Sequence, residues 1–158
     1  KFDTGQYSDL LYPIDDIQVS YGSQNVLLPT PGWKNNSVAM AFDGWYLDDK
    51  YTKKITEITA GTYGDITLYA KWLEIFTITW MVNGEVSSTT EVVEGEPITP
   101  PASPDPGDYC GQVFAGWTDA EMAETSVAAP TLYPTPNPFP KASADAIFYA
   151  VFADYVTE

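Results

Sequence analysis

Histidine is absent from this sequence, and cysteine occurs once, at Cys110. Without histidine, the chain can form neither a Ser/His/Asp or Cys/His nucleophilic arrangement nor a histidine-ligated metal site. A single cysteine also excludes an intrachain disulfide and a Cys/His zinc cluster. These absences remove several large enzyme classes, and we expect no catalytic residue, no cofactor and no metal centre.

Basic residues are also scarce, with seven Lys plus Arg against 22 Asp plus Glu and a formal net charge of -15. This charge repels phosphate backbones and anionic lipid headgroups, so nucleic acid is a poor partner. The acidic residues are dispersed along the chain, which is typical of a solvated surface. Two carboxylates will fall at a glycosidase's spacing by chance among so many, so we give an enzyme the lowest rank of the functions considered.

Long apolar runs are missing too. No segment approaches the ~20 consecutive apolar residues that a membrane span needs, so we expect no membrane insertion in this fragment. The chain starts at Lys1 without Met and enters a strand-like segment at once. We interpret it as a piece of a longer exported protein, whose export signal or anchor lies outside it.

The sequence is nevertheless rich in material for a packed core: 44% of the residues are hydrophobic and 15% are aromatic. Alternation of apolar and polar residues predicts half-buried strands at Ile17–Tyr21, Ile66–Trp72 and Phe76–Trp80. Asn83-Gly84 is the kind of pair that closes a tight hairpin. Little helix is expected.

Two short turns are the exceptions. Thr118 could cap a turn of helix in which Glu121 reaches back before Met122, and Asp48-Asp49-Lys50 is its counterpart earlier in the chain. The fold class predicted from these patterns is mostly β.

An internal repeat organises the chain. Phe42-Asp43-Gly44-Trp45-Tyr46 returns 72 positions later as Phe114-Ala115-Gly116-Trp117-Thr118. Leu68-Tyr69-Ala70-Lys71-Trp72 returns 80 positions later as Phe148-Tyr149-Ala150-Val151-Phe152, so the second copy has gained residues, which we place in the Pro-rich stretch Pro130–Pro140. We predict two modules, residues 1–73 and 74–158.

Modules of this size have marginal cores, and large aromatic side chains are the expected remedy, because each removes ~150 to 250 Å² from water. The glycines before Trp45 and Trp117 suggest a close backbone approach or a positive φ. Cys110 aligns with Val38, which favours a small buried apolar position over a reactive thiol. The residues predicted to be structural are Phe42, Gly44, Trp45, Leu68, Ala70, Trp72, Phe114, Gly116, Trp117, Phe148, Ala150 and Phe152.

At these landmarks the sequence resembles the Listeria/Bacteroides repeat family, the B-repeat type of internalin-like surface proteins. Units of that family end in a pattern close to F-x-G-W-Y, a variable stretch, then L-Y-A-x-W. The first module matches closely, and the second departs from it where Lys71 and Trp72 become Val151 and Phe152. The resemblance implies tandem, β-grasp-like, antiparallel-sheet modules in extracellular proteins of the bacterial cell surface, and it supplies no catalytic residue.

Two functions follow as alternatives. The first is a non-catalytic region of adhesion or spacer modules, whose partner is a protein or a glycan at the cell surface. The second is a carbohydrate-binding module that stacks aromatic rings on sugars, with Trp33, Tyr46 and Tyr51 as its candidate residues, since Trp33 lies in a Pro-Gly loop and the tyrosines flank an acidic turn. Flat, exposed aromatic rings would favour the carbohydrate-binding function, and buried aromatic side chains would favour the spacer function. Weak calcium binding is a further possibility at three acidic pairs: Asp15-Asp16, Asp48-Asp49, and Asp105 with Asp108.

Overall fold

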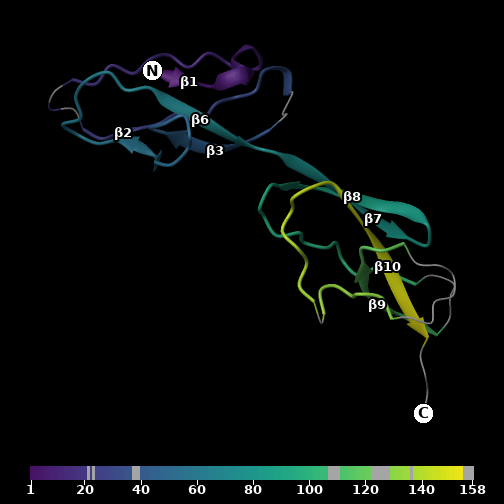
Figure 1. Ribbon diagram of the computed structural model, residues 1–158. Helices are drawn as coiled ribbons and strands as arrows, with labels where there is room; N and C mark the ends of the chain where they lie inside the picture. The colour runs from purple at the N-terminus through teal and green to yellow at the C-terminus, as the bar shows by residue number, and fades with distance from the viewer. Residues whose placement is uncertain are drawn as a thin grey trace. The chain divides into compact units, whose positions relative to one another are not determined.

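The computed structural model describes residues 1–20, 22, 24–36, 40–106, 111–121, 129–135 and 137–154 (Figure 1). The chain divides into two compact units, Lys1–Glu74 and Ile75–Glu158. Cys110, Val38, Asp108, Met122 and Tyr21, which the sequence interpretation used, lie outside the described residues.

In unit 1 the last strand lies at the centre of a four-stranded sheet with the order β1-β6-β3-β4. The first strand, β1, runs parallel to β6, and β3 runs antiparallel to it. A separate antiparallel pair is formed by β2 and β5. The elements of unit 1 are β1 (Phe2–Asp3), the 3-10 helix η1 (Gly5–Leu10), β2 (Val26–Leu27), the 3-10 helix η2 (Lys34–Asn36), β3 (Ala41–Tyr46), β4 (Lys54–Ile55), β5 (Glu57–Ile58) and β6 (Leu68–Leu73).

Unit 2 repeats this plan with longer strands, in the order β8-β7-β10-β9. Its last strand is again central, parallel to the first strand β7 and antiparallel to β9. β8 pairs with the outer side of β7 through a hairpin. The strands of unit 2 are β7 (Ile75–Val82), β8 (Glu85–Val93), β9 (Gln112–Thr118) and β10 (Ala146–Asp154).

The two sequence landmarks of each unit are antiparallel partners in the same register. Trp45 on β3 pairs with Ala70 on β6, and Trp117 on β9 pairs with Ala150 on β10. Both pairs contain a β-bulge at the same motif position: Asp43 is the extra residue between Phe42 and Gly44, and Ala115 is its equivalent in unit 2. The variable residue of the aromatic-x-Gly-Trp motif is therefore the bulged one.

Each unit encloses its own aromatic core. Trp45, Leu68 and Ala70 are buried in unit 1, with Phe2, Phe42 and Trp72 among the half-buried residues packed against them. In unit 2 the buried cluster consists of Ile78, Trp80, Val92, Ile98, Trp117, Ala142 and Phe148.

The Pro-rich insertion completes the core of unit 2. Its Tyr133 forms an antiparallel bridge with Trp117, the position that Ile55 of β4 takes opposite Trp45 in unit 1. Tyr133 stacks on Phe139 with ring centroids 5.2 Å apart, and Phe139 meets Phe148 at 5.1 Å. The extra residues therefore replace an edge strand.

The mostly β fold with little helix is confirmed, and the sheets prove mixed, because the first and last strands of each unit pair in parallel. The hairpin at Asn83-Gly84 is also confirmed: both residues have positive φ, as a type I′ turn requires.

Three local predictions were wrong. Ile17–Ser20 alternates between half-buried and exposed residues, but it forms no strand. Thr118 is the last residue of β9 and no helix follows it as far as Glu121. Asp48-Asp49-Lys50 forms a bend and turn instead of helix.

Candidate functional site

The motif residues predicted to be structural lie in or against the two cores. Five of them are half-buried: Phe42, Trp72, Phe114, Ala150 and Phe152. The others are buried: Gly44, Trp45, Leu68, Ala70, Gly116, Trp117 and Phe148. The buried side chains among them form the centres of the two cores, and most of the half-buried ones pack against those centres.

The buried indoles also satisfy their polar atoms inside the protein. Trp45 donates its Nε1 hydrogen to the carbonyl of Pro29 at 2.7 Å, and Trp80 donates to Oγ1 of Thr90 at 3.0 Å. A buried N–H without an acceptor would cost about 1 to 3 kcal/mol, so these contacts fix the orientation of each ring.

The bulge glycines explain their place in the motif. Gly44 has φ +155° and Gly116 has φ +150°, a region that residues with a side chain rarely adopt. A Cβ atom on Gly44 would lie 2.5 Å from Cε of Lys54, and one on Gly116 would lie 2.8 Å from the carbonyl oxygen of Tyr133. The same bulge is thus covered by a side chain in unit 1 and by backbone in unit 2.

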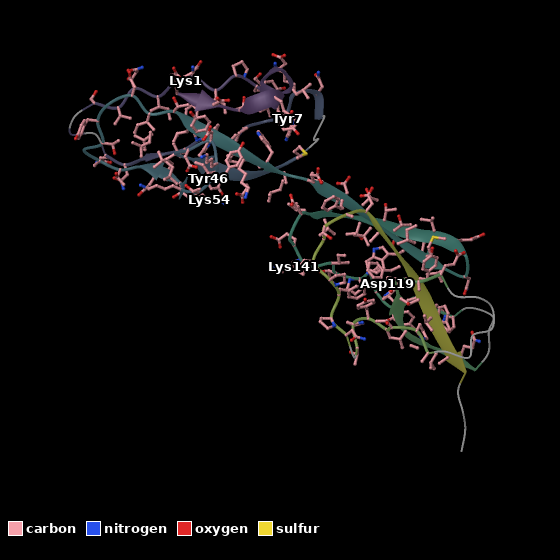
Figure 2. The ribbon with its side chains drawn as sticks, viewed as in Figure 1. Lys1, Tyr7, Tyr46, Lys54, Asp119 and Lys141 are labelled. Carbon is pink, nitrogen blue, oxygen red and sulfur yellow. The ribbon has the colours of Figure 1, made fainter. Side chains whose placement is uncertain are left out.

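A charged cluster surrounds the bulge of unit 1 only. The Asp43 carboxylate accepts hydrogen bonds from the Tyr46 hydroxyl at 2.5 Å and from Nζ of Lys54 at 3.0 Å, and Nζ of Lys71 lies 3.8 Å away. Both lysine ammonium groups lie about 6 Å from the centre of the Tyr46 ring, at 6.0 and 5.8 Å. Tyr46 and Lys54 are labelled next to each other in Figure 2. At the repeat displacements, Asp43 and Lys71 correspond to Ala115 and Val151, so unit 2 has no equivalent of this cluster.

This cluster shifts two titrations. Burial raises the pKa of Asp43, but the hydrogen bonds from Tyr46 and Lys54 and the charges of Lys54 and Lys71 outweigh it, so the pKa lies below its ordinary value. The hydrogen bond to Asp43, together with burial, raises the pKa of Tyr46 to about 12. The arrangement engages the Asp43 carboxylate with the Tyr46 hydroxyl and the two lysine ammonium groups beside the bulge.

The three candidate sugar-stacking residues have different environments. Trp33 is half-buried, with its ring centroid 5.6 Å from Tyr7 and 5.1 Å from Trp72. Tyr46 is buried at 7% exposure. Tyr51 is 42% exposed and meets Tyr46 edge-on at 5.5 Å, so it is the one exposed residue of the three.

Sequence reasoning missed Tyr63, which at 92% exposure is the most exposed aromatic side chain among the residues that the structure describes. It stands beside a hollow of about 530 Å³ in unit 1, lined by polar groups that include Gln18, Thr62, Asp65 and Thr67. Tyr63 lies in the loop between Gly61 and Gly64, both of which have positive φ. An aromatic residue in a glycine-bounded loop was the signal that could have identified it.

Two of the three acidic pairs proposed for calcium lie within the described residues, and the third includes Asp108, which lies outside them. The Asp48 carboxylate accepts backbone hydrogen bonds from Lys50, Thr52 and Lys53, and this capping produces the turn that was predicted as helix. Over the ranges that the structure describes, no three acidic side chains come close enough to hold a metal ion. Asp15 and Asp16 are exposed on the surface of unit 1.

None of the helices among the described residues is long and apolar enough to cross a membrane. Two relatives come from Evansella cellulosilytica. One, named as a Gly-rich membrane protein, is 30% identical over 66% of this chain and 12% of its own length. The other, named as a membrane protein, is 33% identical over 60% of this chain and 14% of its own length, so the chain spans only a small part of both.

The sequence model of the Listeria-Bacteroides repeat domain matches residues 4–71 and 76–151. These segments contain both copies of the paired landmarks except the last residue of each copy, Trp72 and Phe152, and the matching model describes a repeat domain. The chain belongs to the Listeria-Bacteroides repeat domain family, of which it carries two tandem copies.

Proposed function

We propose that these two modules are a non-catalytic spacer and adhesion region of a protein on the outside of a bacterial cell. The observation that carries the proposal is the repeated use of one strand pair: in each unit the aromatic-x-Gly-Trp strand and the last strand meet in the same register and close a separate core. Repeating the aromatic motif in this way gives two folded units, one after the other along the chain. Membership in a repeat family and the names of the Evansella relatives support a place at the cell envelope.

The test of the location is labelling of intact cells of the bacterium that encodes the chain. Antibodies raised against the full 158 residues should label unpermeabilised cells, and external protease should abolish the signal. An antibody against a cytoplasmic protein is the control, and it should stain only permeabilised cells. Labelling confined to permeabilised cells would refute the proposal.

For adhesion, the outer edge of β8 is the place where a protein strand could add, because β8 is the terminal strand of its sheet. Its exposed residues include Val86 and Thr89, and β8 contains neither proline nor lysine, which commonly guard such edges.

A glycan-binding role is the second candidate, favoured by the polar hollow beside Tyr63. A glycan array probed with the full chain tests it. Tyr63→Ala should abolish any saturable binding, whereas the matched control Tyr12→Ala removes another exposed ring, 59% exposed, outside that hollow. Equal binding by both variants, or no binding by the unmodified chain, would remove this candidate.

A further inference from the structure

The first and last strands of each unit are neighbours and run in the same direction. In unit 2 the parallel register joins Ala146 to Ile78 and continues to Tyr149 opposite Met81. In unit 1 it joins Phe2 to Leu68 and Asp3 to Tyr69. The chain therefore enters each parallel pair at one end of the strands and leaves it at the opposite end.

We propose that these parallel terminal pairs are mechanical clamps, and that the two repeats resist tension applied along the chain. The inference deepens the proposed spacer function, because a spacer between two attached structures is the setting in which such tension arises. The resistance itself is a property of the strand geometry.

Tension on the two ends of unit 2 pulls β7 and β10 past each other along their length. In this shear geometry the hydrogen bonds between the strands carry the load together, since those of a parallel pair are evenly spaced along it. A force applied across the strands would instead break the same bonds one after another. The clamp is therefore strong in the direction that the chain ends define.

Packing reinforces the clamp of unit 2. Trp80 and Phe148 are register partners across β7 and β10, and their rings stack with centroids 5.3 Å apart at an angle of 23°. Their exposed fractions are 0% and 1%, so water cannot replace the strand hydrogen bonds before the core slides. Asp145 adds a further bond at the start of the pair, where its carboxylate accepts the Thr77 N–H at 2.8 Å.

The covalent path connects the two clamps in series. β6 ends at Leu73 and β7 begins at Ile75, so only Glu74 separates the last strand of one clamp from the first strand of the next. Tension that leaves β6 enters β7 at its first residue. Because the pairing of β1 with β6 is shorter, unit 1 should yield at lower force than unit 2.

Single-molecule force spectroscopy on the full chain tests the proposal, with handles at the two termini and Cys110→Val to remove the native thiol. We expect two rupture events. The second and stronger one should release about 80 residues of unit 2, roughly 28 nm of extended chain. In the matched control the same protein carries its handles at Glu74→Cys and Ala144→Cys, which lie just before β7 and β10, so the same strands peel apart.

The end-pulled protein should rupture unit 2 at several-fold higher force than the control. Equal rupture forces in the two geometries would overturn the clamp. If Ala144→Cys fails to give the near-ultraviolet circular dichroism of the parent, the neighbouring exposed Ser143→Cys provides the same geometry. The rupture forces do not depend on where the protein is located in the cell. The force experiment can therefore refute the clamp while cell labelling supports the surface location, and cell labelling can refute the location while the force experiment supports the clamp.

Discussion

Replacing Gly116 with alanine tests the explanation of the bulge. The new Cβ would lie 2.8 Å from the carbonyl oxygen of Tyr133, a distance that real Cβ contacts essentially never show. Tyr133 cannot retreat easily, because its backbone exchanges two hydrogen bonds with Trp117, at 2.9 and 2.8 Å. Relief of the clash requires either the loss of these bonds or a movement of β9.

The magnitude follows from two contributions. A residue with a side chain in such a sparsely populated backbone region costs about 1 to 3 kcal/mol. Each of the two hydrogen bonds contributes about 1 kcal/mol net. If both hydrogen bonds are lost, we expect Gly116→Ala to lower the free energy of unfolding of unit 2 by about 3 to 5 kcal/mol, which for a unit of this size lowers its Tm by at least ~10 °C.

Differential scanning calorimetry of the full chain measures this change. Gly95→Ala is the matched control, because Gly95 also has positive φ, +82°, but open space around its Cβ position. It should lose only about 1 kcal/mol of unfolding free energy. Equal effects of the two substitutions would refute the reasoning, because backbone strain alone would then account for Gly116.

Further predictions concern the acidic groups of the chain and Tyr46. The stability that Asp43 contributes is present above its ordinary pKa of 3.8 and is lost as the pH falls through its lowered value, so Asp43→Asn should flatten the acid limb of the unit 1 Tm profile. The pKa of Tyr46 is raised to about 12, so the stability that its protonated hydroxyl contributes is lost as the pH rises from 10 to about 12. In Asp43→Asn the pKa of Tyr46, followed by tyrosinate absorbance, should fall toward 10. An unchanged pKa would contradict the hydrogen bond to Asp43 as the cause of the shift. Asp48→Ala should accelerate amide hydrogen exchange at Thr52 and Lys53, whose backbone N–H groups donate to the Asp48 carboxylate. The control Asp49→Ala should leave both exchange rates unchanged. Unchanged exchange in Asp48→Ala would show that the turn does not depend on these hydrogen bonds. Isothermal titration with millimolar calcium should show no heat for the unmodified chain, because backbone N–H groups engage the Asp48 carboxylate and no three acidic side chains come together among the described residues; saturable heat would contradict this expectation.

The repeated landmarks carried most of the predictive power for the fold. Their displacements of 72 and 80 positions matched Trp45 with Trp117 and Ala70 with Ala150. In the structure Trp45 is the cross-strand partner of Ala70, and Trp117 is the cross-strand partner of Ala150. The turn at Asn83-Gly84 was predictable because few residue pairs tolerate positive φ at both positions.

Other features depend on contacts between distant segments, which a local pattern does not encode. Alternation with a period of two is the same in parallel and antiparallel strands, so the parallel pairing of β7 with β10 was not predictable. Ile17–Ser20 alternates between half-buried and exposed residues, as a strand on the surface of a core would, although it forms no strand. Nor does sequence spacing reveal that Tyr133 takes the place of Ile55, or that Lys54 and Lys71 converge on Asp43.

The central claim is that the chain consists of two repeats, each folded around its own aromatic core. Trp45→Ala should cost unit 1 about 3 to 5 kcal/mol, most of the stability that a unit of this size possesses. A two-dimensional ¹H–¹⁵N spectrum of the full-length variant should then lose the dispersed signals of unit 1 and keep those of unit 2, with Trp117→Ala giving the reverse. Loss of both sets of signals in either variant would contradict the account.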